Sequence, residues 1–257
     1  MVQISVLLSA ALTLLPLASC AKILLAGDST MAQSSSATQQ GWGTPFAQYM
    51  NIEVVNLARG GRSARSYTRE GLFDALVTQI VAGDYVVIEF GHNDGGSTST
   101  SERAPVGGTG TDTETVTLAD GTVEVVQTFV TYERNMVAKV LAKGGIPIIS
   151  SQTPNGDAWN TALTAIGTPP RFVGYAEVAA AQSGAVYMDH WKWTAIAYED
   201  LGYSAVYPTL FPQDHTHTNP AGADVVAKAF VNGLKCISHP LASLLTTAGN
   251  AIPKVCS

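Results

Sequence analysis

The architecture of this chain is set by a short segment near its start, Lys22-Ile-Leu-Leu-Ala-Gly-Asp-Ser-Thr30. Its first residues are almost entirely apolar and a glycine follows them, which is typical of a buried strand in a parallel sheet. Gly27 permits a sharp backbone turn where a larger residue would clash. Ser29 therefore follows the carboxyl end of the first strand, where open α/β sheets bind ligands. An alternative interpretation is that Asp28 or Ser29 only caps a helix.

Strand-like and helical patterns alternate along the rest of the chain. The predicted strands are 22–26, 52–57, 85–90, 146–150 and 185–188. The predicted helices are 44–50, 70–81, 129–142, 170–183, 193–201 and 220 to about 231. In the last of these, Asn219 suits the N-cap, Pro220 the first turn and Gly233 the stop. Residues 95–121 are rich in Gly, Ser and Thr, so we interpret them as an excursion over the surface.

This alternation predicts an α/β protein with a three-layer αβα sandwich and right-handed crossovers. We expect a five-stranded parallel sheet in flavodoxin-like order. No repeat or linker separates a second domain, so residues 21–257 are expected to form a single domain.

The composition is that of a globular protein with few charges. Hydrophobic residues make up 46% of the chain, charged residues 13%, and the net charge is −6. The sequence has no basic tract, which argues against nucleic acid as a partner.

Residues 1–20 are predicted to be a signal peptide. The run 4–17 is nearly all apolar but short for a membrane span, and small residues follow it. We therefore expect a secreted, extracellular protein without a membrane anchor, cleaved near Cys20 or Ala21. The segment Leu17-Ala18-Ser19-Cys20 also resembles a bacterial lipobox, in which Cys20 would carry a lipid. The absence of Lys and Arg before Lys22 counts against that alternative.

Once Cys20 is removed, Cys236 and Cys256 remain as an even pair in an oxidising compartment. They are predicted to form a disulfide that ties the C-terminal tail to the last helix. On the loop-entropy estimate such a bridge stabilises the fold by about 3 kcal/mol.

Residues that suit acyl transfer follow three of the predicted strands. Ser29, Gly61 and Asn93 come after the first, second and third strands. Parallel strands share one carboxyl end, so these residues are expected at one edge of the sheet. The loop before the last helix holds Asp214 and His217, and a helix packed on the sheet brings that loop to the same edge.

These residue types meet the requirements of a serine hydrolase. Ser29 is the predicted nucleophile, and His217 would take its proton and later return it to the leaving alkoxide. Asp214 would hold the imidazole tautomer. The backbone N–H groups of Ser29 and Gly61 and the Asn93 amide would form the oxyanion hole, where losing one donor costs about 3 kcal/mol.

At these positions the chain resembles the SGNH (GDSL) hydrolase superfamily. The four similar blocks are Gly27-Asp28-Ser29, Gly61, Gly91-x-Asn93-Asp94 and Asp214-x-x-His217. More narrowly, the segments 26–31, 60–66, 89–94 and 214–218 resemble rhamnogalacturonan acetylesterases. The resemblance implies an SGNH hydrolase domain over 21–257, with catalytic Ser29, His217 and Asp214 and oxyanion donors at Ser29, Gly61 and Asn93.

The same resemblance implies release of acetate from an acetylated plant cell-wall polysaccharide, without a cofactor. We expect the protein to be a monomer. The chain departs from the family in two respects. Residues 97–127 contain no cysteine where members often carry an extra pair, and the glycosylation sites common in the family are missing.

Three further side chains are candidates for substrate binding: Arg62, His92 and Trp42. Arg62 belongs to a cluster of arginines suited to uronate carboxylates, and tryptophan rings stack on sugars. The alternatives are a solvated loop for Arg62, a turn residue for His92 and core packing for Trp42.

Residues Asp214, His215 and His217, with Asp28 as a fourth, suit a metal site as another interpretation. That interpretation leaves the serine and oxyanion blocks unexplained, so we predict no metal. Acetylxylan or a small acyl ester is an alternative substrate. An alternative of another class is a carbohydrate-binding protein that has lost turnover.

Overall fold

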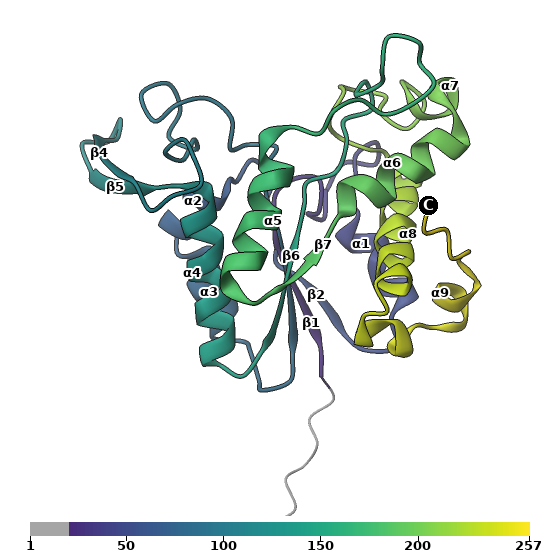
Figure 1. The fold of residues 1–257 in the computed structure, drawn as a ribbon, viewed down its shortest axis with the longest axis horizontal. Helices are drawn as coiled ribbons and strands as arrows, with labels where there is room; N and C mark the ends of the chain where they lie inside the picture. Colours follow the sequence, from purple (N-terminus) through teal and green to yellow (C-terminus); the bar gives the residue numbers. More distant parts are fainter. Residues whose placement is uncertain (1–20) are drawn as a thin grey trace, which may run out of the picture.

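The computed structural model describes residues 21–257, and the predicted signal peptide lies outside the described residues. A five-stranded sheet runs through the centre of the molecule in the order β2-β1-β3-β6-β7, with all neighbours parallel (Figure 1). Its strands are β1 (Ile23–Gly27), β2 (Val54–Asn56), β3 (Tyr85–Glu89), β6 (Ile146–Ser150) and β7 (Val186–Met188). This confirms the predicted parallel sheet and its flavodoxin-like order.

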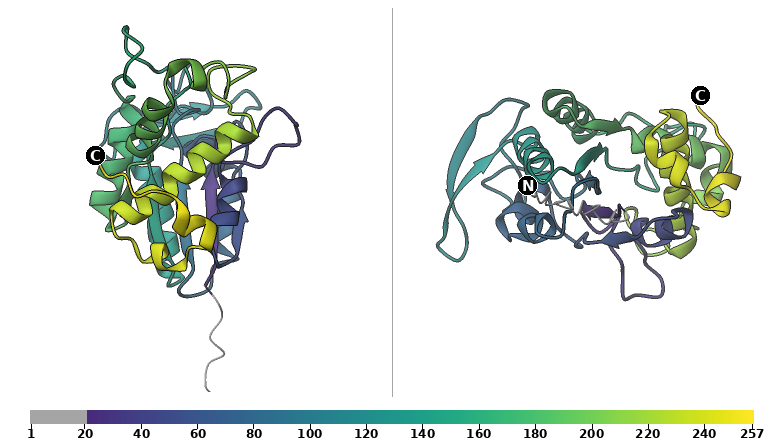
Figure 2. Two further views of the ribbon diagram at one scale, coloured as in Figure 1. Left: turned by 90° about the vertical axis from the view of Figure 1, so that its right-hand side faces the viewer. Right: turned by 90° about the horizontal axis from the view of Figure 1, so that it is seen from below.

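Helices cover both faces of the sheet (Figures 1 and 2). One layer holds α2 (Ala64–Arg69), α3 (Leu72–Val77), α4 (Phe129–Ala142) and α5 (Arg171–Ser183). The other layer holds α1 (Gly43–Phe46), α6 (His190–Leu201) and α8 (Pro220–Cys236). The remaining short elements are η1 (Ala47–Tyr49), α7 (Tyr203–Val206), η2 (Pro240–Leu244) and α9 (Thr247–Ala251).

The central strands are buried on both faces because alternate side chains enter different cores. In β1, Leu25 packs toward α1 and α8, whereas Leu24 and Ala26 pack toward the α2–α5 layer. Every residue of β1 and β3 is buried. The continuous apolar run in the sequence is therefore the consequence of helices on both faces.

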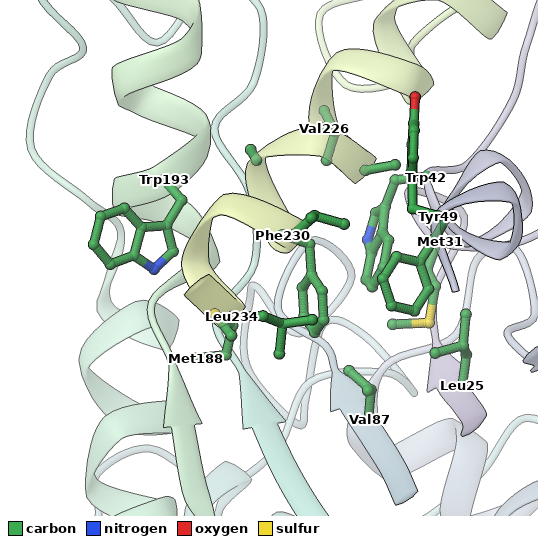
Figure 3. Close-up of a cluster of buried hydrophobic side chains, with 14 of the residues drawn as sticks. Leu25, Met31, Trp42, Tyr49, Val87, Met188, Trp193, Val226, Phe230 and Leu234 are labelled. Atoms are coloured by element: carbon green, nitrogen blue, oxygen red, sulfur yellow. The ribbon is translucent and has the colours of Figure 1, made fainter. Parts of the chain in front are cut away.

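Helix α8 ends later than predicted, because it continues through Gly233 to Cys236. A Cβ atom on Gly233 would lie 2.5 Å from Trp193 Cδ1 and 2.6 Å from Met188 Sδ. Figure 3 shows Trp193 and Met188 beside this end of α8. Gly233 is therefore a contact point between helix and sheet and not a helix stop.

The prediction of one helix over 70–81 is also wrong. The segment contains only α3, and α2 precedes it, separated by Gly71 with a φ of +69°. Ser63 caps α2 in a capping box whose N3 residue is Ser66 rather than the commoner Glu or Gln. Because serine occupies this position, the sequence signal for the start of α2 is weak.

The segment 95–121, interpreted as a surface excursion, contributes a strand. Strand β4 (Thr113–Thr117) pairs antiparallel with β5 (Val123–Gln127) to form a projecting hairpin (Figures 1 and 2). Arg65 on α2 fastens the hairpin through a 2.7 Å ion pair with Glu124. β4 is mostly exposed, so its sequence lacks the apolar pattern that identifies a buried strand.

The C-terminal tail is tied to the end of α8. Cys236 and Cys256 are joined in a disulfide. Asn232 adds two hydrogen bonds, since its Nδ2 donates to the Val255 carbonyl at 2.7 Å and its Oδ1 accepts from the Val255 N–H at 2.9 Å. Over residues 21–257, no helix combines the length and apolar character needed to span a membrane.

Candidate active site

Ser29 lies in a turn directly after β1. No helix begins there, so the helix-cap interpretation is wrong. Asp28 instead shapes the turn, because its Oδ1 accepts hydrogen bonds from Thr30 N–H at 2.9 Å and Thr30 Oγ1 at 2.8 Å. A Cβ atom on Gly27 would lie 2.8 Å from the Glu89 carbonyl oxygen. Glycine is therefore required for the close approach of β1 to β3 below the serine.

The loop with Asp214 and His217 reaches Ser29 because both sides of it are held by backbone hydrogen bonds. Gln40 N–H donates to the Thr218 carbonyl at 2.8 Å, and Gly156 N–H donates to the His215 carbonyl at 2.7 Å. Asn219 then caps α8 by accepting from Gly222 N–H at 2.9 Å. As predicted, Asn219 and Pro220 start the helix that supports this loop.

The structure brings Ser29, His217 and Asp214 into one line of hydrogen bonds. His217 Nε2 lies 2.9 Å from Ser29 Oγ, and His217 Nδ1 lies 2.7 Å from Asp214 Oδ2. In this arrangement the carboxylate accepts a hydrogen bond from Nδ1–H, so Nε2 is left to accept the serine proton.

Asp214 is held in its ionised form. Partial burial alone raises the pKa of its carboxyl group. Hydrogen bonds from the His217 ring and from the backbone N–H groups of His217 and Thr216 lower the pKa by more than burial raises it. The two backbone bonds reach Asp214 Oδ1 at 2.7 Å each. The net result is a pKa below the usual value for aspartate, which preserves the negative charge beside the imidazole.

Two of the donors predicted for the oxyanion hole are the backbone N–H groups of Ser29 and Gly61. Among residues 21–257, the backbone N–H groups of Ser29 and Gly61 have no hydrogen-bond acceptor. The loop after β2 lies against the serine, since a Cβ atom on Gly60 would be 3.7 Å from Ser29 Cβ. Gly61 has a φ of +76°, a conformation that favours glycine.

The third predicted donor, Asn93, follows β3. Its Nδ2 donates to the Arg62 carbonyl at 3.1 Å, and its Oδ1 accepts from Arg103 at 3.0 Å. The next residue, Asp94, braces this turn by accepting from Ala64 N–H at 3.0 Å. One N–H of the Asn93 amide thus has no bond within the described part of the chain.

The prediction that Trp42 binds substrate is wrong. Trp42 is completely buried and stacks on Phe230 with ring centroids 4.8 Å apart. Its Nε1 donates to Glu89 Oε1 at 2.7 Å. Figure 3 shows Trp42 facing Phe230 inside the core. The core-packing alternative is therefore correct, and the buried Glu89 supplies the acceptor that an indole N–H needs.

The other two substrate-binding candidates have neighbours within the protein. Arg62 forms an ion pair with Glu70 at 2.9 Å. His92 lies near the buried Asp28, where burial raises the pKa of the carboxyl group and the His92 charge opposes that rise. Substrate binding by Arg62 and His92 stays a prediction.

The residues of the metal alternative do not gather in one place. His217 and Asp214 bond to each other, while the His215 ring lies 3.2 Å from Asp157. Among residues 21–257, no group of at least three His, Cys, Asp or Glu side chains is arranged to hold a metal ion.

Two functional neighbours were not predicted from the sequence. Arg103 lies in the segment interpreted as a surface excursion, where nothing in the local composition sets it apart. Glu89 ends β3, and its Oε2 accepts from Ser150 Oγ at 2.6 Å and contacts His190 Nδ1 at 2.8 Å. Glu89 thereby joins β3, β6 and α6 beneath the site.

A buried acid lies behind this edge of the sheet. Glu133 on α4 is completely buried, and neither of its carboxyl oxygens has a hydrogen-bond partner within residues 21–257. Burial raises its pKa well above the usual value, and the nearby Asp94 and Glu89 raise it further. The folded chain therefore keeps a proton that the unfolded chain releases at a lower pH.

This difference predicts that Glu133 makes a pH-dependent contribution to the free energy of unfolding, and that Glu133→Gln removes this contribution. With the raised pKa, the Glu133 contribution is complete below the unfolded pKa and is lost as the pH rises toward the folded pKa. The expected loss is about 1.4 kcal/mol for each pH unit within that window. Urea unfolding at pH 4 and pH 7 should show that Glu133→Gln gains stability over the original chain mainly at pH 7. The exposed Glu177→Gln serves as control, and an equal pH dependence in all three proteins would contradict the prediction.

Comparisons with known proteins identify the family of this chain and agree with its fold. A family profile described as GDSL-like Lipase/Acylhydrolase matches residues 23–230. A rhamnogalacturonan acetylesterase of Emericella nidulans is 48% identical over 236 residues, which cover 91% of this chain and 93% of the relative. A probable rhamnogalacturonan acetylesterase of Bacillus subtilis is 27% identical, covering 85% of this chain and 94% of the relative.

Solved structures share the fold at lower identity. The crystal structure of the Bacillus subtilis protein YxiM aligns with a TM-score of 0.71 and 22% identity, over 86% of this chain and 58% of that one. An acetyl-xylooligosaccharide esterase mutant from Geobacillus aligns with a TM-score of 0.55 and 15% identity, over 84% and 94% of the two chains. The profile spans most of the sequence, and so does the 48% identical relative. This chain therefore belongs to the GDSL-like lipase/acylhydrolase family of carboxylic ester hydrolases.

Proposed function

We propose that this protein is a secreted serine esterase that removes acetyl groups from acetylated rhamnogalacturonan. The observation that carries the proposed chemistry is the contact of His217 with both Ser29 Oγ, at 2.9 Å, and Asp214 Oδ2, at 2.7 Å. Nucleophile, base and orienting acid are thus within hydrogen-bond distance in the chain itself.

The proposed reaction has two halves. Ser29 Oγ attacks the acetyl carbonyl carbon while its proton passes to His217 Nε2, and the carbonyl oxygen becomes an anion. The N–H groups of Ser29 and Gly61 and the Asn93 amide stabilise that oxygen. The intermediate then collapses, the bond to the sugar oxygen breaks, and His217 returns the proton to this leaving oxygen.

The second half regenerates the enzyme. Water attacks the acetyl-serine ester and gives its proton to His217, which passes the proton to Ser29 Oγ as acetate leaves. The low pKa of Asp214 keeps a negative charge beside the imidazole in both halves, when the ring is transiently a cation.

The substrate assignment rests on similarity across most of the chain. The Emericella nidulans relative, 48% identical, is a rhamnogalacturonan acetylesterase. Identity at this level over 91% of this chain supports the same substrate class here. Secretion is supported by the predicted signal peptide and by the Cys236–Cys256 disulfide, a bond typical of oxidising compartments.

The proposal is tested by comparing acetate release from acetylated rhamnogalacturonan and acetylated xylan at matched acetyl concentrations. We expect a higher kcat/KM on rhamnogalacturonan. Equal or greater kcat/KM on xylan would reject the pectic assignment while retaining the esterase chemistry. Labelling of Ser29 by a fluorophosphonate probe separates an esterase from a binding protein without turnover, because only an activated serine reacts.

A further inference from the structure

Arg103 contacts both Gly61 and Asn93, two of the residues predicted to supply oxyanion donors. Its Nη1 donates to Asn93 Oδ1 at 3.0 Å and lies 3.3 Å from the Gly61 carbonyl oxygen, which also accepts from it. The side chain comes from the segment between β3 and β4, which Arg65 on α2 also contacts through the carbonyls of Ser101 and Ala104. One guanidinium group therefore bridges the turns after two different strands.

The arginines near Arg103 use their charge differently. Arg62 pairs with Glu70, and Arg65 and Arg69 both pair with Glu124. In the described residues Arg103 has no carboxylate within salt-bridge distance. Its hydrogen bonds go to two neutral oxygens, those of Asn93 and Gly61, and its charge also acts to lower the pKa of the buried Asp94 carboxyl group, which burial raises.

These contacts determine which way the Asn93 amide faces. A guanidinium group can only donate hydrogen bonds, and the Arg62 carbonyl can only accept them. With Oδ1 toward Arg103 and Nδ2 toward Arg62, both contacts are satisfied. The flipped amide would set donor against donor and acceptor against acceptor. The observed orientation leaves the second Nδ2 hydrogen for another acceptor.

We propose that Arg103 is a positioning residue of the oxyanion hole, acting through Asn93. It holds the amide so that its second N–H faces the developing oxyanion, and it steadies the carbonyl of Gly61, whose N–H is another donor. Its positive charge also polarises the Asn93 amide, which strengthens the N–H as a donor. This inference rests on the serine-esterase chemistry proposed above.

The test uses an uncharged substrate, 4-nitrophenyl acetate, so that attraction of a uronate carboxylate plays no part. Arg103→Gln should lower kcat about tenfold with little change in KM, a fraction of the roughly 10²- to 10³-fold cost of losing an oxyanion donor. Arg103→Lys should recover part of this loss because it keeps a charged donor. Arg134→Gln on α4 removes the same charge beside a cavity between α4 and α5, and should match the original chain.

A double-mutant cycle separates action through Asn93 from independent action. If Arg103 works through the amide, adding Arg103→Gln to Asn93→Ala should lower kcat less than twofold further. A full tenfold additional loss would overturn the proposal. So would an unchanged kcat on 4-nitrophenyl acetate combined with a raised KM only on the acidic polysaccharide, which indicates binding of a substrate carboxylate.

A spectroscopic readout keeps this inference distinct from the proposed function. The Asn93 side-chain amide can be assigned in a ¹⁵N–¹H spectrum by its absence in Asn93→Ala. Arg103→Gln should shift that signal, whereas Arg134→Gln should not. An unmoved signal would overturn the positioning role even if the chain is an esterase. A wild-type chain that hydrolyses no acetyl ester would reject the proposed function, while the amide signal still reports on Arg103.

Discussion

Ser29→Ala is expected to lower kcat for acetate release by about 10⁴- to 10⁶-fold, the largest effect of any single substitution in this chain. The reason is that Ser29 Oγ is the only atom in the line of hydrogen bonds able to form the acetyl ester. The residual rate would come from the oxyanion donors and from substrate binding, which the substitution leaves in place.

This experiment is read by acetate release together with fluorophosphonate labelling, both of which should disappear. Ser243→Ala provides a matched control, because it makes the same chemical change at an exposed serine of η2. The variant and control should unfold at similar temperatures. More than a few per cent of wild-type activity in Ser29→Ala would exclude the proposed nucleophile.

Asp214→Asn is expected to lower kcat by about 10⁴-fold with little change in KM. Asparagine can present its NH₂ group to His217 Nδ1, which favours the tautomer with the proton on Nε2 and blocks proton uptake from Ser29. The neutral amide also gives up the charge that stabilises the imidazolium. Both effects act on the 2.7 Å contact between His217 and Asp214.

A neighbouring acid–histidine pair supplies the control for this substitution. Asp157 lies 3.2 Å from the His215 ring, and Asp157→Asn makes the same change outside the proposed triad. We expect that variant to stay within about twofold of wild type, since exposed ion pairs contribute little. Comparable losses in the two variants would contradict the assignment of Asp214.

The pH dependence of activity should also depend on the pair formed by Asp214 and His217. Hydrogen bonds hold the pKa of Asp214 below its usual value, so its carboxylate remains charged on mild acidification. Loss of activity toward low pH should therefore report protonation of the His217 imidazole, which removes the general base. A rate that stays constant to low pH would contradict this role of His217.

The proximity of most predicted site residues depends on sheet architecture. Ser29, Gly61 and Asn93 each follow a parallel strand, and such strands end at one edge. Asp214 and His217 lie three residues apart, which is close enough for a loop to pair them. Backbone hydrogen bonds from Gln40 and Gly156 hold their loop beside Ser29, and no local sequence pattern predicts these contacts.

Two of the errors concern residues whose role depends on a distant partner. Trp42 was a candidate for sugar stacking, but Glu89 accepts its indole hydrogen bond inside the core. Gly233 has the composition of a helix stop, but the close approach of Trp193 requires it within α8.

The parallel sheet, its strand order and the residues at its carboxyl edge follow from the sequence, because apolar periodicity and the ends of strands are local properties. The long-range contacts come from folding alone: Arg103 on the oxygens of Asn93 and Gly61, Glu89 beneath the site, and the burial of Glu133, whose carboxyl group has no hydrogen-bond partner among residues 21–257. The contacts of Arg103 and Glu89 depend on the three-dimensional arrangement because they join side chains from separate elements. Glu133 is removed from water because side chains from several elements surround its carboxyl group. The residues next to these side chains in the sequence do not predict such contacts.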